Sequence, residues 1–107
     1  AGRRPLPGAS DYCVSKAAVI MLTQTVATEY STSNIRINAI GPGFIETPMT
    51  ANIRQSPEWM DTVMQMTPMQ RMGQANEIAS TALFLASDES SYFTGQTLFP
   101  NGGMFTG

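Results

Sequence analysis

The chain has 107 residues, enough for one small domain with its own core and too few for two. Its six basic and eight acidic residues give a net charge of −2 and form no basic stripe, so nucleic acid is not an expected partner. One cysteine and no histidine exclude an internal disulfide and the usual zinc-ligand sets, so we expect no metal and a cytoplasmic location.

The apolar pattern, read between prolines and glycines, predicts alternating helices and strands. A first helix should follow an N-cap at Ser10, and a strand in "IRINAI" should stop at "GPG". The helices are expected at about 11–30, 57–66 and 76–87, and the strands at about 35–40 and 95–100. This order is typical of an α/β fold with a parallel sheet of about two strands and two to three helices. No apolar run approaches the roughly 18 residues of a membrane span, so a membrane partner is not expected.

A tyrosine and the only lysine stand four residues apart in "YCVSK", near the start of the first predicted helix. Positions i and i+4 lie on one helix face, so Tyr12 and Lys16 can interact. A positive charge about 5 Å away, at an effective dielectric of about 20, favours a phenolate by about 3 kcal/mol. The pair therefore suits general acid/base chemistry, although such a pair can also be a half-buried aromatic beside a solvated lysine.

The turn "GPGFIET" follows a predicted strand, where parallel sheets bind ligands. It is not the dinucleotide fingerprint, because Glu46 stands where G-x-G-x-x-G needs its last glycine. After this turn, six of the eight methionines lie between residues 49 and 72. They suit either an adaptable pocket wall or a filled core. In "RMGQANEIA", we expect Arg71, Gly73 and Glu77 to fix the approach to the next helix, and "NGG" at 101–103 to form a turn.

These stretches resemble, in order and spacing, the C-terminal portion of the short-chain dehydrogenase/reductase family. The resemblance is carried by "YCVSK", "IRINAIGPGFIETPM" and "RMGQANEIASTALFLASDESSYFTGQTLFPNGG", and it covers essentially the whole chain. It implies the C-terminal part of a Rossmann-like, doubly wound parallel sheet. Residues 1–107 would then be a fragment of one oxidoreductase domain, with a substrate lid at about 47–73. Asn101 departs from the family, which more often has aspartate there.

The resemblance also implies roles for individual residues. Tyr12 would be the general acid/base, and Lys16 would lower its pKa and hydrogen-bond the nicotinamide ribose. Pro42 and Gly43 would shape the turn beside the nicotinamide. Ile45 would offer backbone groups to the carboxamide, and Thr47 would offer its hydroxyl to the carboxamide or a phosphate. Hydride would pass between a small alcohol or carbonyl substrate and the nicotinamide cofactor.

The family's glycine-rich phosphate loop and catalytic serine fall upstream of residue 1. We therefore expect NAD or NADP to bind only together with the missing N-terminal half, and the fragment alone to be inactive. Charged residues make up 13% of the chain, about half the roughly 25% usual for soluble domains. That scarcity, and a first helix apolar on several sides, predict a homo-oligomer. The alternatives to an oxidoreductase fragment are a non-catalytic, self-associating module and a truncation product.

Overall fold

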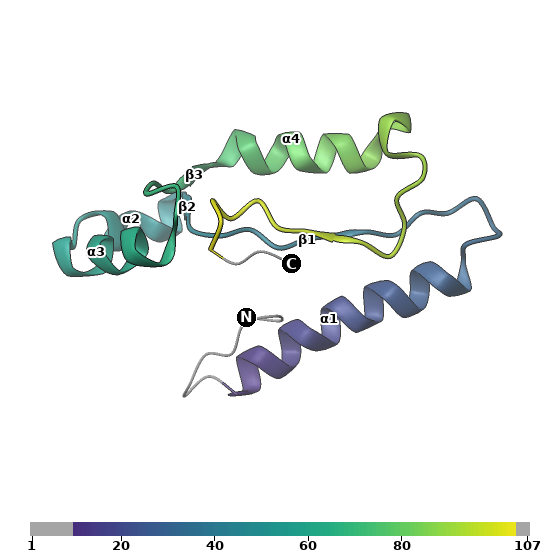
Figure 1. Cartoon of the computed structure of the whole chain (residues 1–107), viewed down its shortest axis with the longest axis horizontal. Helices are drawn as coiled ribbons and strands as arrows, with labels where there is room; N and C mark the ends of the chain where they lie inside the picture. The colour runs from purple at the N-terminus through teal and green to yellow at the C-terminus, as the bar shows by residue number, and fades with distance from the viewer. Residues whose placement is uncertain (1–9, 105–107) are drawn as a thin grey trace. The chain divides into compact units, whose positions relative to one another are not determined.

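The computed structural model describes residues 10–104, and the side chains from residue 14 on. Figure 1 shows the elements of the chain, coloured from the N-terminus to the C-terminus. The chain divides into two compact units. Unit 1 contains residues up to Ala39 together with Ser90–Leu98, and unit 2 contains Ile40–Glu89 together with the residues from Phe99 on.

Unit 1 is built on α1 (Ser10–Glu29), close to the predicted bounds. The helix begins at Ser10 itself, so the expected N-cap lies inside the helix, a one-residue difference usual at helix ends. Thr23 and Ala27 are its buried side chains in the described part. A Cβ added to Gly95 would lie 3.5 Å from the Cβ of Ala27, so α1 packs against the segment around Gly95.

The strands of the described chain are shorter than the sequence predicts. β1 (Ala39–Ile40) is hydrogen-bonded to β4 (Thr97–Leu98), where 35–40 and 95–100 were expected. Before β1, side-chain hydrogen bonds supplement the backbone bond from the Gly95 N–H to the Ile37 carbonyl. Arg36 Nη1 donates to the Ser90 carbonyl at 2.8 Å and to its hydroxyl at 3.0 Å. Asn38 donates to the Phe93 carbonyl at 3.1 Å and accepts from the Gln96 amide at 3.0 Å.

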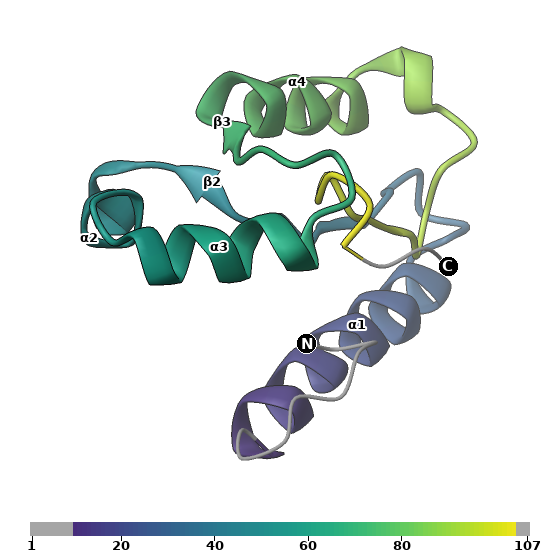
Figure 2. The same cartoon turned by 60° about the vertical axis from the view of Figure 1, so that its left-hand side comes forward.

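Unit 2 contains a second pair of strands that the sequence analysis did not predict. β2 (Ile45–Glu46) and β3 (Gly73–Gln74), both labelled in Figure 2, run parallel. Ile45 is paired with Gly73. The Gly73 N–H donates to the Phe44 carbonyl at 2.8 Å. Two-residue strands are too short to carry a period-2 pattern, which is why the sequence gives no sign of them.

Helices follow β2 in unit 2. A 3-10 helix (Pro48–Thr50) and α2 (Ala51–Arg54) occupy a stretch for which the sequence predicts no helix. Pro48 starts a helix instead of breaking one, because its fixed φ suits a first turn. α3 (Pro57–Met66) has the predicted bounds, and its Ser56 N-cap accepts a hydrogen bond from the Trp59 amide.

The methionine-rich segment has mixed burial. Met72 is buried, whereas Met49 is 93% exposed and Met69 is 60% exposed. The fully buried side chain of α3 is Val63. Core filling therefore accounts for Met72 and not for the exposed methionines.

The last elements of unit 2 are α4 (Ala75–Ala86), a 3-10 helix (Asp88–Ser90) that runs into unit 1, and a terminal turn. Asn101 is buried, and its Oδ1 accepts a hydrogen bond from the Gly103 N–H at 2.9 Å. Gly102 and Gly103 both have positive φ, so the expected "NGG" turn is confirmed. Helices with short strands, one pair of them parallel, confirm the α/β fold class.

Gly43 offers a test of this packing. Its N–H donates to the Pro100 carbonyl at 3.2 Å, and an added Cβ would lie 2.7 Å from the Asn101 Cα. The Asn101 Cα is a backbone atom and cannot move away by a change of side-chain rotamer. We therefore expect Gly43→Ala to lower the free energy of unfolding by about 1 to 3 kcal/mol. Urea unfolding followed by circular dichroism measures this. Gly73→Ala is the matched comparison, because its Cβ would meet the movable Cδ1 of Ile45, and an equal loss in both variants would contradict the argument.

Candidate functional site

The residues predicted for the site lie in two groups. Position 12 and Lys16 are one turn apart on α1 in unit 1, and the Tyr12 side chain lies outside the described residues. Lys16 is exposed. It precedes the buried Thr23 and Ala27 by seven and eleven residues, so these three positions share one stripe of α1.

The other four predicted residues lie together in unit 2. Pro42 is exposed, and Gly43, Ile45 and Thr47 are half-buried along the turn from β1 into β2 and the 3-10 helix. The structure therefore brings the members of each group together, one group in each unit.

The backbone of this turn is held by two side chains that the sequence analysis missed. The Thr50 hydroxyl donates to the Ile45 carbonyl at 2.8 Å and accepts from the Thr47 N–H at 3.0 Å. Arg54 Nη2 donates to the Thr47 carbonyl at 2.9 Å. The sequence signal that could have identified Thr50 is its hydroxyl three residues after Thr47, which is the spacing of a capping box.

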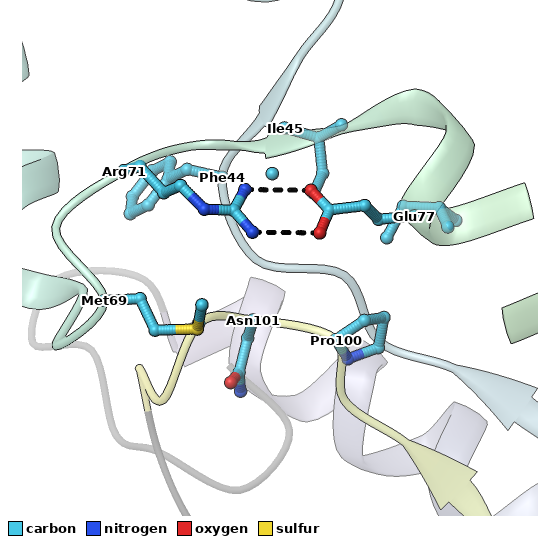
Figure 3. A pocket seen from close by; sticks show the side chains of 10 residues that line it. Phe44, Ile45, Met69, Arg71, Glu77, Pro100 and Asn101 are labelled. Carbon is cyan, nitrogen blue, oxygen red and sulfur yellow. Dashed lines mark hydrogen bonds and ion pairs between the residues drawn. The ribbon is translucent and has the colours of Figure 1, made fainter. Parts of the chain in front are cut away.

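Beside the turn, unit 2 contains a pocket of about 180 Å³. β2, β3, α4 and the terminal turn all contribute to its wall (Figure 3). Its lining is mostly apolar, with one ion pair: Phe44, Ile45, Met69, Arg71, Gly73, Glu77, Ile78, Pro100, Asn101 and Gly102.

The ion pair at this pocket is bidentate. Arg71 Nη1 and Nη2 donate to Glu77 Oε1 and Oε2, both at 2.9 Å. Glu77 Oε1 also accepts from the Gln74 N–H at 2.9 Å, and Arg71 Nη1 donates to the Met72 carbonyl at 3.1 Å. These bonds fix the chain as it enters α4, as expected from the sequence. The hydrogen bonds from Arg71 and from the Gln74 amide lower the pKa of Glu77 from 4.5 to about 2.

Within residues 10–104, no group of three or more histidine, cysteine, aspartate or glutamate side chains is placed to hold a metal ion. The same part of the chain contains no helix that is both long and apolar enough to span a bilayer.

Comparisons with known proteins cover nearly the whole chain. A family model described as Enoyl-(Acyl carrier protein) reductase matches residues 1–105. The 3-oxoacyl-(acyl-carrier-protein) reductase FabG of Thermotoga maritima is 48% identical over 98 residues, which are 92% of this chain and 39% of that protein. The chain thus spans about two fifths of the length of this curated relative.

Solved structures match to a similar extent. 4-Hydroxyisoleucine dehydrogenase complexed with NADH has a TM-score of 0.93 at 31% identity, over 99% of this chain and 44% of that one. A 2-deoxy-D-gluconate 3-dehydrogenase from Agrobacterium tumefaciens, described as putative and with bound NADP, has a TM-score of 0.83 at 34% identity. That match covers 87% of this chain and 38% of the other. Both neighbours are described as dehydrogenases, one complexed with NADH and the other with bound NADP.

The Arg71–Glu77 pair gives a pH-dependent prediction. Because the pKa of Glu77 is lowered in the folded chain, its contribution to stability is complete above pH 4.5 and is lost as the pH falls towards 2. Both side chains are nearly half exposed, so solvent screening keeps this contribution small. We expect the stability difference between wild type and Glu77→Gln to be constant from about pH 7 to 5 and to shrink towards pH 2. Urea unfolding across this range measures it, and a difference undiminished at pH 2 would refute the assignment.

Proposed function

This chain belongs to the short-chain dehydrogenase/reductase family, and we propose that it is the C-terminal part of an NAD(P)-dependent oxidoreductase. The proposed reaction interconverts a hydroxyl and a carbonyl group on a small-molecule substrate. The observation that carries the proposal is the Tyr12–Lys16 pair on α1 in a chain whose residues 1–105 match the family. NADH and NADP in two solved neighbours support a nicotinamide cofactor without selecting between NAD and NADP.

In the proposed reaction, Tyr12 moves the proton. When an alcohol is oxidised, its hydroxyl proton passes to the Tyr12 phenolate, and when a carbonyl is reduced, the Tyr12 hydroxyl returns that proton to the oxygen. NAD or NADP, when bound, would accept hydride from the substrate carbon or supply hydride to it. The Lys16 ammonium, one helical turn from Tyr12, favours the phenolate and would hydrogen-bond the nicotinamide ribose.

The turn in unit 2 would hold the nicotinamide carboxamide. The Ile45 carbonyl accepts one hydrogen bond, from Thr50, and a carbonyl oxygen has a second lone pair for a carboxamide N–H. The Thr47 hydroxyl can donate to the carboxamide oxygen or to a phosphate. This set of one acceptor and one donor fits a carboxamide, and Pro42 and Gly43 would shape the backbone beside it.

The proposed site needs more than this chain. The chain spans 39% of the Thermotoga relative, and the rest of that length corresponds to no residue here. We therefore propose that NAD or NADP binds only when an N-terminal part is present, and that the 107-residue piece alone is inactive. Residues 47–73 would form the lid over the substrate, and the exposed Met49 and Met69 suit its adaptable surface.

A chimera tests the catalytic assignment. Residues 1–107 replace the matching segment of the Thermotoga reductase, and reduction of a 3-oxoacyl substrate is followed by cofactor absorbance. Tyr12→Phe keeps the ring and removes the transferable proton, so kcat should fall at least about 100-fold. Tyr30→Phe is the matched control and should keep its rate. A Tyr12→Phe chimera that retains most of its activity would rule out the role given to this residue.

Lys16→Met in the same chimera should move the pH–rate profile to higher pH and raise the KM for the cofactor, because the charge that favours the phenolate is gone. An unchanged profile would contradict the role of Lys16. The unfused chain is the control: it should show no activity and no measurable cofactor binding, and micromolar affinity would contradict the need for an N-terminal part.

A second candidate function, self-association, is favoured by the outer stripe of α1. Val14 is 68% exposed, Met21 59% and Leu22 61%. With Ala18, they lie across the helix from Thr23 and Ala27, given 100° per residue. Burying one large apolar side chain stabilises by about 1.5 to 3 kcal/mol, so a second copy of this helix is a fitting partner. Such a dimer would leave Lys16, on the opposite side of the helix, exposed.

Sedimentation velocity at micromolar concentration tests this. Wild type should sediment as a dimer or larger species, and Met21→Lys should shift it towards 11.5 kDa monomer by placing a charge in the stripe. Thr32→Lys adds the same charge at an exposed position beyond the helix and should not change the distribution. A well-folded wild-type monomer would exclude association through α1.

A further inference from the structure

The turn that carries Ile45 and Thr47 is contacted from two sides within unit 2. On one side, the Gly43 N–H bonds to the Pro100 carbonyl, and Gly43 lies directly against Asn101. On the other side lies β3, whose Gly73 N–H bonds to the Phe44 carbonyl at 2.8 Å. Gln74 adds a side-chain bond to Glu46 at 3.0 Å. The position of β3 therefore sets the position of the turn on that side.

β3 has only two residues, so its own ladder fixes it weakly. The Arg71–Glu77 pair holds it at both ends. Arg71 reaches the carbonyl of Met72, just before β3, and Glu77 accepts the amide of Gln74, its last residue. The guanidinium and carboxylate then close this stretch with two parallel bonds (Figure 3). Gly73 lies in the middle of the stretch.

A movement of β3 would directly displace the Ile45 side chain. A Cβ on Gly73 would come within 2.7 Å of Ile45 Cδ1, so this side chain packs on the bare backbone of Gly73. Ile45 and Phe44 also line the pocket that the ion pair borders. A shift of Gly73 would therefore be transmitted both through the Phe44 carbonyl and through the Ile45 side chain.

The exposure of the pair indicates what it does. Both side chains are nearly half exposed, and exposed ion pairs add little to stability. A bidentate pair, by contrast, fixes geometry strongly, because two parallel bonds determine the orientation of both groups. We propose that Arg71 and Glu77 are positioning residues: they fix β3, and β3 fixes the backbone of residues 44–47 against the nicotinamide carboxamide. The last step rests on the function proposed above.

The first test uses the 107-residue chain and needs no activity. Amide hydrogen exchange at Gly73 is compared with exchange at Gly95, whose N–H bonds to the Ile37 carbonyl at 2.7 Å in unit 1. Glu77→Gln should speed exchange at Gly73 about threefold to fivefold relative to Gly95, because local opening of β3 in this variant no longer has to break the ion pair. Glu89→Gln removes the same charge from the 3-10 helix and should leave the ratio unchanged. Arg71→Lys keeps the positive charge but cannot form the two parallel bonds, so it should increase the Gly73 exchange rate by a smaller factor. This variant replaces Glu77→Gln in the test if Glu77→Gln does not fold.

The second test uses the chimera with the Thermotoga reductase. Glu77→Gln should raise the KM for the cofactor about fivefold while kcat changes less than about twofold, the pattern of lost binding that is not specific to the transition state. Glu89→Gln should change neither constant.

The outcomes separate the two proposals. An unchanged Gly73-to-Gly95 exchange ratio in both Glu77→Gln and Arg71→Lys overturns the positioning role, whatever the activity. Faster exchange with an unchanged cofactor KM overturns the link from β3 to the nicotinamide. An inactive wild-type chimera contradicts the proposed function instead, and the exchange ratio then decides the role of the ion pair in β3 separately.

Discussion

The hydrogen bond from the Gly73 N–H to the Phe44 carbonyl is the contact on which the arrangement of unit 2 depends. It joins the turn after β1 to the segment that leads into α4, two parts of the chain far apart in sequence. The parallel register that follows places Ile45 opposite Gly73 and Glu46 opposite Gln74. With only two residues in each strand, backbone pairing alone would be weak, so the side chains around it decide whether it holds.

In both units, side-chain hydrogen bonds support a short pair of strands. In unit 1, Arg36 and Asn38 bind the carbonyls and amides of the 90–96 segment, where a longer strand would have used its own backbone. In unit 2, Arg71 binds the Met72 carbonyl and Glu77 binds the Gln74 amide, while the Gln74 side chain bonds to the Glu46 carboxylate. A guanidinium presents several donors in a rigid plane, so one arginine can satisfy carbonyls that no ladder reaches. These residues are few in a chain poor in charge, and they are placed where backbone pairing is shortest.

Each unit would carry out a different part of the proposed reaction. Proton transfer would belong to α1 in unit 1, and the hold on the nicotinamide would belong to the turn in unit 2. α1 suits its part because a long helix fixes the spacing of positions 12 and 16 without help from other elements. The turn has no such regularity, so its geometry is imposed by Thr50, Arg54 and β3. This difference explains why the unit 2 side of the proposed site needs supporting residues.

The family, the α/β class and the long helices could be predicted from the amino-acid sequence alone. α1, α3 and α4 lie within a residue or two of their predicted bounds, because apolar spacing, Pro57 and the residues before α4 act locally. It also indicated which residues to consider for the site, since the Tyr-Lys spacing is a local property of one helix. The shortness of the strands and the pairing of β3 with β2 are apparent only in the folded chain. Those features depend on hydrogen bonds between residues distant in sequence, such as Gly73 with Phe44 and Arg36 with Ser90, and no local pattern encodes such partners.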